Sequence, residues 1–273
     1  MSDIRKIRYK KMNGNQTSGG RMIKSKPPPS PFVPVELQPL RRTNGDPSSR
    51  MAVVLNPNDD AKEVGVVSNE YKLVKNSDVV QVAEDLLANT GMAFNDHQTL
   101  WNGKKFRQRY LLSQTSGEVK VGDVVACTLD AVSSYDGSTT FGLEFNAVRL
   151  VCANGMMLSF MLGGFRFKHW GSQNFDREMR VAARQLTRVG DRLHIVLPTL
   201  TELTRKRMKR ADIQRFFAEI NLPITTQAKV FNAIEDDTRW GVYNAATDVL
   251  TKQEKFSSEN LNRRVSQYFL SPN

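Results

Sequence analysis

The sequence is poor in the residues that build disulfides and metal sites. Its 273 residues include two cysteines, Cys127 and Cys152, and three histidines, His97, His169 and His194. Two isolated thiols exclude a disulfide framework and a thiolate metal site, and they fit a reducing compartment. No histidine has a His, Cys or acidic partner at a metal-ligand spacing on one helix or turn, so we interpret all three as ordinary surface or core residues. We therefore expect no metal and no other cofactor.

Long apolar runs and catalytic motifs are also missing. No window approaches the roughly 18 uninterrupted apolar residues that a membrane-spanning helix needs. The basic residues 1–11 are not followed by the apolar stretch of a signal peptide. There is no glycine-rich phosphate loop followed by Lys and Ser or Thr, no nucleophile elbow and no His-Glu-x-x-His zinc pair. We expect neither membrane insertion nor secretion, and nothing in the sequence supports an enzyme.

Positive charge is abundant and unevenly distributed. The chain has 39 Lys and Arg against 28 Asp and Glu, a net charge of +11. Residues 1–50 alone hold 11 basic and three acidic residues, together with seven prolines. Such a segment buries too little apolar surface to offset the entropy of ordering it. We therefore expect a basic, disordered tail over 1–63, which either follows a polyphosphate or binds an acidic protein partner, and one domain over 64–273.

The spacing of apolar residues predicts an α+β fold. Apolar side chains recur at three and four residues over 79–87, which predicts an amphipathic helix after a short strand. Asn102-Gly103 and Asp136-Gly137 supply the positive φ values of tight type I′ turns and predict two antiparallel hairpins. A turn at Asn154-Gly155 is expected to lead into a strand over 157–170. The sheet region, 64–171, is therefore predicted to be an antiparallel meander.

Residues 172–273 are predicted to be helical. One long helix is expected from about Asn174 to Pro198, because proline should kink or end it. Further helical windows follow at 199–208, 211–220, 226–234, 238–251 and 259–270. The expected architecture is an antiparallel sheet with a preceding amphipathic helix, a long basic helix and a helical C-terminal region.

The long helix carries arginines at every third or fourth position, which places them on one face beside the apolar one. Like charges at this spacing repel, and a polyanion or an acidic partner would neutralise them. The alternative is a solvated face with local ion pairs. The arginines are Arg177, Arg180, Arg184, Arg188 and Arg192.

Two strand segments interleave basic and aromatic residues. Alternation along a strand sends Phe165 and Phe167 to one face, where they fill the core, and the basic residues to the other. Exposed aromatics that stack on bases, beside cations that contact the backbone, are typical of single-strand binding. The candidate nucleic-acid contacts on these strands are Lys104, Lys105, Arg107, Arg109 and Tyr110 in the first segment, and Arg166, Lys168 and Trp170 in the second.

Three stretches together resemble a known family. They are Val66–Val74 (VVSNEYKLV), Arg149–Met156 (RLVCANGM) and Trp240–Thr247 (WGVYNAAT). In this order they are similar to the phage/plasmid-like protein family, a group of unknown function carried by bacteriophages and mobile elements. The resemblance spans about residues 64–255 and implies a bacterial cytoplasm, but no catalytic residue. The order of elements also resembles single-strand annealing recombinases, which implies rings or filaments that hold single-stranded DNA in a basic groove.

The leading hypothesis is a single-stranded DNA-binding protein that promotes annealing without nucleotide hydrolysis and self-associates into a ring or filament. One alternative is a structural or interaction protein with an acidic host or phage partner. Another is a metal-dependent nuclease that uses Asp236 and Asp237, although an acidic pair of this kind is also typical of a solvated helix end.

Overall fold

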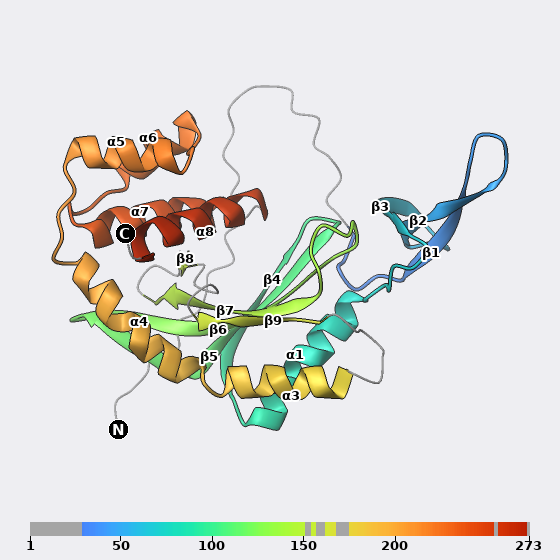
Figure 1. Cartoon of the computed structure of the whole chain (residues 1–273), viewed down its shortest axis with the longest axis horizontal. Coiled ribbons are helices and arrows are strands. Elements are labelled where there is room, and N and C mark those ends of the chain that lie inside the picture. Colours follow the sequence, from blue (N-terminus) through green and yellow to red (C-terminus); the bar gives the residue numbers. More distant parts are fainter. Residues whose placement is uncertain (1–28, 151–153, 157–161, 168–174, 254–255, 272–273) are drawn as a thin grey trace.

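The computed structural model describes residues 29–150, 154–156, 162–167, 175–253 and 256–271, and it confirms the α+β class (Figure 1). The described residues form two antiparallel sheets, with helices on both sides of the larger one. The strands are β1 (Val35–Arg41), β2 (Pro47–Leu55), β3 (Lys62–Ser68), β4 (Phe94–Trp101), β5 (Lys105–Lys120), β6 (Asp123–Ser134), β7 (Gly142–Arg149), β8 (Asn154–Met156) and β9 (Gly164–Arg166). The helices are α1 (Asn76–Thr90), α3 (Phe175–Leu186), α4 (Val189–Leu203), α5 (Arg210–Glu219), α6 (Ile224–Asn232), α7 (Arg239–Thr251) and α8 (Phe256–Leu270).

The larger sheet is a meander in the order β4-β5-β6-β7-β8, with β9 also paired to β7. The turn between β4 and β5 is tight and Gly103 has a φ of 90°, which confirms the predicted hairpin. The predicted type I′ turn is wrong, because Asn102 does not have a positive φ. The prediction of an equally tight turn at Asp136-Gly137 is wrong, because β6 ends at Ser134 and β7 begins at Gly142. Asn154-Gly155 is not a turn either, since both residues pair with β7 inside β8.

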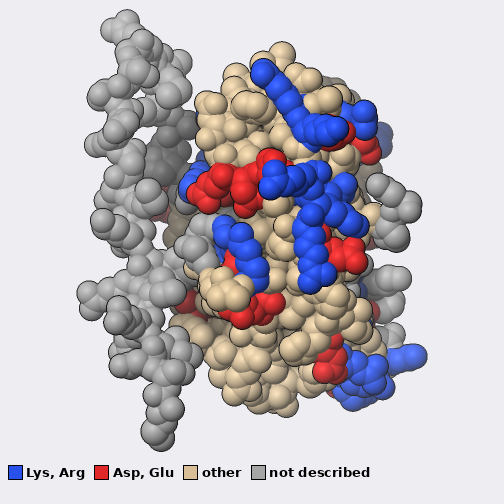
Figure 2. Space-filling view, turned by 90° about the vertical axis from the view of Figure 1, so that its left-hand side faces the viewer, with Lys and Arg blue, Asp and Glu red and all other residues tan. Residues whose placement is uncertain are grey.

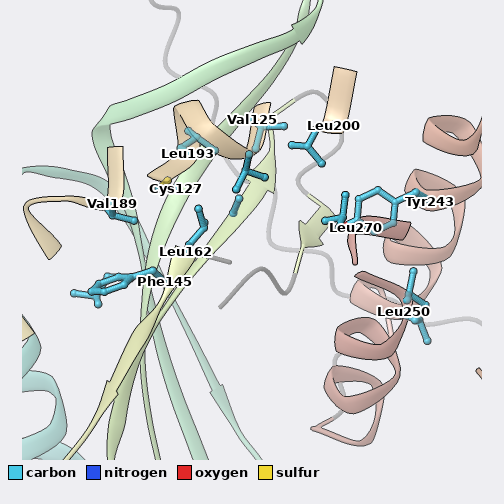
Figure 3. Close-up of a cluster of buried hydrophobic side chains, with 14 of the residues drawn as sticks. Val125, Cys127, Phe145, Leu162, Val189, Leu193, Leu200, Tyr243, Leu250 and Leu270 are labelled. Atoms are coloured by element: carbon cyan, nitrogen blue, oxygen red, sulfur yellow. The ribbon is translucent and has the colours of Figure 1, made fainter. Parts of the chain in front are cut away.

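One face of this sheet is apolar and is covered by α1, α3 and α4 (Figure 1). Figure 3 shows Val189 and Leu193 of α4 against Val125, Cys127 and Phe145 of the sheet. Burial raises the pKa of the Cys127 thiol to about 12, so this cysteine behaves as a core residue. The opposite face carries the charged residues of the strands, and α7 and α8 lie over that side.

The predicted long helix is divided into α3 and α4. Arg188 separates them, with φ −99° and ψ 1°. The buried residues of α3 include Ala182 and Leu186, whereas α4 packs mainly on β5. Two short helices can follow the edge of a twisted sheet more closely than one straight helix. Of the two expectations for Pro198, a kink or an end of the helix, the second is wrong, because α4 continues through it to Leu203.

The first sheet, β1-β2-β3, corrects the expectation of a disordered tail over 1–63 for residues 35–63. Residues 1–28 lie outside the described part of the chain. Pro39 is accommodated because β1 is an edge strand, and Pro47 because it is the first residue of β2. Val53 and Leu55 are fully buried in a small core that includes Tyr135, the residue directly after β6 of the larger sheet. This segment does bury apolar surface, contrary to its basic, proline-rich composition.

Among the helices that the structure describes, none has the length and apolar character needed to cross a membrane.

Candidate functional site

A group of charged side chains with a buried centre lies on the polar face of the larger sheet, and we call it the ion-pair cluster. Strand register brings three members side by side, since Arg109 of β5 pairs with Asp130 of β6, which pairs with Glu144 of β7. Arg107, two residues before Arg109, shares their face because side chains alternate along a strand. Among the described residues, the cluster consists of Arg107, Arg109, Asp130, Glu144, Arg166, Glu259 and Arg263.

Arg107 is the centre of this cluster. Its Nη1 donates to Asp130 Oδ2 at 2.7 Å and to Glu144 Oε2 at 3.2 Å. Its Nε and Nη2 donate to the two oxygens of Glu259, on α8, at 2.8 and 2.9 Å. Arg109 makes a second bidentate contact to Asp130, at 2.9 and 2.7 Å. These charge-assisted bonds connect the strands to α8 and satisfy the buried guanidinium groups.

Glu144 accepts from three arginines. Arg166 and Arg263 both contact its Oε1, and Arg107 contacts its Oε2. Burial alone raises the pKa of Glu144, but the positive charges of Arg107, Arg166 and Arg263 outweigh it and lower the pKa to about 2. The pKa of Asp130 is likewise lowered, because Arg109 and Arg107 outweigh the effect of burial. Both carboxylates are therefore ionised at neutral pH.

The strand residues proposed as nucleic-acid contacts occupy different environments. Arg107 is 5% exposed, and Arg109 is mostly buried, so the prediction of a solvated basic sheet face is wrong for both. Tyr110 is fully buried, and its hydroxyl donates to Glu84 at 3.2 Å, so it has no surface on which a base could stack. Lys104 is exposed, whereas Lys105 is only partly so.

The second strand segment is described only in part. Arg166 belongs to β9, and its side chain is 40% exposed beside Glu144. Gly142 lies opposite Arg166 in the sheet and leaves no room for a Cβ, because the Arg166 side chain passes over it. Phe167 is buried in the core, as predicted. Lys168 and Trp170 lie outside the described residues.

The helical arginines form a second candidate surface, which we call the arginine stripe: Arg177, Arg180, Arg184 and Arg188. All four side chains are exposed, and their spacing of three and four residues places those of α3 on one face. Within the described part of the chain, none of the four lies within salt-bridge distance of a carboxylate. Arg192 differs, since it is partly buried and its Nη1 donates to the carbonyl of Leu162 at 2.7 Å.

A third basic group lies in the connection from α4 to α5, and we call it the basic connection: Arg205, Lys206, Arg207, Lys209 and Arg210. Figure 2 shows that side of the molecule, where basic side chains gather with acidic ones between them. Lys206 pairs with Glu202 at 3.1 Å and Arg207 with Asp237 at 3.1 Å. The positive charge of this group is therefore partly neutralised by the protein itself.

Asp236 and Asp237, the acidic pair considered for a nuclease, serve local structure. Asp236 accepts from the backbone and the hydroxyl of Thr238, the residue that caps α7. Asp237 forms the ion pair with Arg207. The described residues contain no group of three or more His, Cys, Asp or Glu side chains placed to hold a metal ion.

Two of the three family-like stretches meet at one buried carboxylate. Asp123 accepts from Arg149 at 2.6 and 2.8 Å and from the Trp240 indole at 2.9 Å. These hydrogen bonds outweigh the effect of burial and lower the pKa of Asp123. Gly241 is required beside them, because a Cβ would collide with Asp236. The stretches therefore connect α7 to the sheet and have a structural role.

The acidic members of the ion-pair cluster were missed at the sequence level. The sequence did contain a sign of these acidic residues, because Asp130 and Glu144 occupy strand positions whose direct neighbours are apolar. Arg107 and Arg109 stand at alternate positions of one strand and need partners if their face is covered. The identity of the partners was not accessible, since Glu259 is 152 residues away in sequence from Arg107.

Comparison with known proteins places the chain in a family without an assigned activity. No curated protein and no solved structure matches it. A family model matches residues 63–268, from β3 into the last turn of α8, and leaves out β1 and β2. Because this match covers most of the sequence, the chain belongs to the family described as Domain of unknown function (DUF932).

Proposed function

We propose that the protein binds single-stranded DNA and promotes strand annealing without nucleotide hydrolysis, with the arginine stripe in contact with the phosphates. The observation that carries the proposal is the set of four exposed guanidinium groups without a carboxylate partner among the described residues. Successive arginines of α3 are about 4.5–6 Å apart along the helix axis. A bound polyanion would relieve their mutual repulsion.

The arginine stripe supports this function better than the strands do. Arg107 and Arg109 are mostly buried and already bind carboxylates, so they add little exposed positive charge to a phosphate-binding surface. Lys104, in the turn between β4 and β5, remains exposed and is a second candidate contact. The choice of single strands rests on the resemblance of the element order to annealing recombinases. Self-association into a ring or filament would repeat the arginine stripe along the strand.

The salt dependence of binding tests the arginine stripe directly. Each phosphate contact on a single strand contributes about −0.7 to the slope of log affinity against log salt, so four contacts give about −3. Replacement of Arg180, Arg184 and Arg188 by Ala should remove about two units of this slope. Fluorescence anisotropy with a labelled oligonucleotide, measured over a range of KCl concentrations, provides the slope. A folded triple variant with an unchanged slope would show that DNA binds elsewhere.

The basic connection offers a charge-matched control. The triple variant Arg205→Ala, Lys206→Ala, Arg207→Ala also removes three positive charges from exposed positions. Because two of these side chains are already ion-paired, we expect the slope to change by less than about one contact, or 0.7. An equal loss in both triple variants would indicate a general effect of net charge and would contradict a specific role for α3.

Annealing and cleavage assays separate the function classes. Complementary labelled strands should anneal faster with the protein, without ATP, and equally well in magnesium or EDTA. Cleavage that requires magnesium would favour the nuclease alternative instead. Absence of binding to any strand would favour an interaction protein with an acidic partner. Size-exclusion chromatography with light scattering, with and without DNA, tests for the ring or filament.

A further inference from the structure

A polar cavity lies beside the ion-pair cluster, between β5, the loop from β6 to β7, and α8. Its volume is about 430 Å³, within the range of small-molecule sites. Typical ligand cavities are mostly apolar, whereas this one is lined mainly by charged and hydroxyl-bearing side chains. Its charged lining consists of Lys105, Arg107, Arg166, Arg263, Glu144 and Glu259. A ligand for this cavity must itself be polar and charged.

The lining has an excess of positive charge. Four cations face two carboxylates, which leaves a net charge of +2. Behind the lining, Arg109 and Asp130 form their own bidentate pair and add no net charge. Salt screens partly buried charges less than fully exposed ones, so the positive excess in this lining favours a bound anion. A phosphate monoester, with a charge near −2 at neutral pH, matches this excess.

Arg166 and Arg263 are placed so that they can exchange part of their contact with Glu144 for contact with a bound anion. Arg166 and Arg263 both contact Oε1 of Glu144, and their side chains are 40% and 35% exposed. Lys105 lines the cavity and forms no salt bridge within the described part of the chain. Arg107, by contrast, is held by three carboxylates. The three outer cations can therefore close on a phosphate, while Arg107 keeps Glu144 and Glu259 in position.

Neutral groups complete the recognition chemistry. The loop between β6 and β7 contributes the hydroxyls of Ser138, Thr139 and Thr140 to the cavity. Hydroxyl groups and guanidinium groups are the usual donors to phosphate oxygens. Glu144 and Glu259 are acceptors, and an acceptor suits the hydroxyl groups of a sugar. Hydrogen-bond donors suited to a phosphate therefore lie beside acceptors suited to sugar hydroxyls. This combination indicates a ligand that contains a phosphate and a sugar.

We propose that this cavity binds a phosphorylated sugar of the nucleoside 5′-monophosphate class, with Lys105, Arg166 and Arg263 around the phosphate. The site is separate from the arginine stripe, because α3 covers the opposite face of the sheet. The proposal therefore does not depend on DNA binding by α3. The same phosphate chemistry occurs in a free nucleotide and at the 5′ end of a DNA strand.

Calorimetric titration of the full chain tests the site. Thymidine 5′-monophosphate should bind at least tenfold more tightly than thymidine, because thymidine lacks the charge-assisted bonds to the phosphate. Lys105→Gln and Arg263→Gln should each weaken nucleotide binding by roughly tenfold or more. Lys105→Gln removes no salt bridge of the described structure, so its effect on binding is not confused with unfolding. A 5′-phosphorylated dinucleotide that binds as well as the mononucleotide would identify a strand end as the source.

The DNA-binding proposal and this one can fail independently. The triple variant of the arginine stripe should bind thymidine 5′-monophosphate normally, and Arg263→Gln should bind a long oligonucleotide without a 5′-phosphate normally. Equal affinity for thymidine and its monophosphate would overturn the nucleotide site. So would unchanged nucleotide affinity in Lys105→Gln and Arg263→Gln, or no heat of binding with millimolar nucleotide.

Discussion

Arg107 contacts three carboxylates, on β6, β7 and α8, from a side chain that is almost fully buried. A buried ion pair contributes little net stability compared with an apolar replacement of the whole group. Removal of one partner is different, because the remaining charges stay buried without compensation. Arg107 is therefore a structural residue in this chain, although its sequence context first indicated a nucleic-acid contact.

Replacement of Arg107 by Met should lower the free energy of unfolding by about 3–5 kcal/mol, because Asp130, Glu144 and Glu259 would each lose a partner. Urea denaturation followed by circular dichroism measures this change. Arg180→Met is the matched control, and as an exposed residue it should change stability by no more than about 0.5 kcal/mol. Equal stability of the two variants would contradict a structural role for Arg107.

The small sheet β1-β2-β3 lies partly outside the region that the family model matches, but it packs against that region. The family match begins at residue 63, so β1 and β2 lie outside it while β3 lies within it. Those two strands nevertheless cover Val64, Val67 and Tyr135, which are buried together with them. The segment just before β1 also contacts the larger sheet, since the Trp101 indole donates to the carbonyl of Pro29 at 2.8 Å. The strands are part of the packed structure of this chain.

Two truncated chains test the contribution of β1 and β2. A chain that begins at Pro29 keeps both strands, and we expect its urea midpoint to match that of the full chain. A chain that begins at Pro57 lacks them and exposes the side chains of Val64, Val67 and Tyr135. Its stability should fall by at least about 2 kcal/mol, the cost of exposing one or more buried apolar side chains. Equal midpoints for the two chains would show that the first sheet is dispensable.

Over the whole molecule, stability depends on pH through the carboxylates that the arginines hold. The pKa of Glu144 is about 2, against an ordinary value of 4.5. The pKa values of Asp130 and Asp123 are lowered as well. Because these groups bind protons more weakly in the folded state than in the unfolded state, acid favours unfolding. The net charge of +11 also rises as carboxylates are protonated, which adds repulsion in the compact state.

The urea midpoint should therefore be nearly constant from pH 7 to about pH 5 and then decrease steeply. The contribution of Glu144 is complete above pH 4.5, its ordinary value, and is lost as the pH falls toward 2. In Glu144→Gln the slope below pH 4.5 should be smaller, because this group no longer titrates. Unfolding curves at half-unit pH intervals give both slopes, and identical slopes would contradict the assigned pKa.

Local patterns determined much of this fold. The period of apolar residues placed α1 and the helices from α5 to α8 within a few residues of their bounds, because helix periodicity is set by residues three and four apart. Gly103 determined the first hairpin through its positive φ. Spacing also predicted the exposure of Arg177, Arg180, Arg184 and Arg188, but not the partial burial of Arg192 at the same spacing.

Tertiary structure decided the rest. From composition alone, the segment that forms β1 and β2 was predicted to be a proline-rich tail. Only the structure shows that Pro39 lies in an edge strand and that Val53 is buried. The break at Arg188 depends on which surface each helix covers. The partners of Arg107 come from β6, β7 and α8, and no local pattern specifies a contact over 152 residues. The cavity forms where these distant elements meet, so local sequence patterns could not predict it.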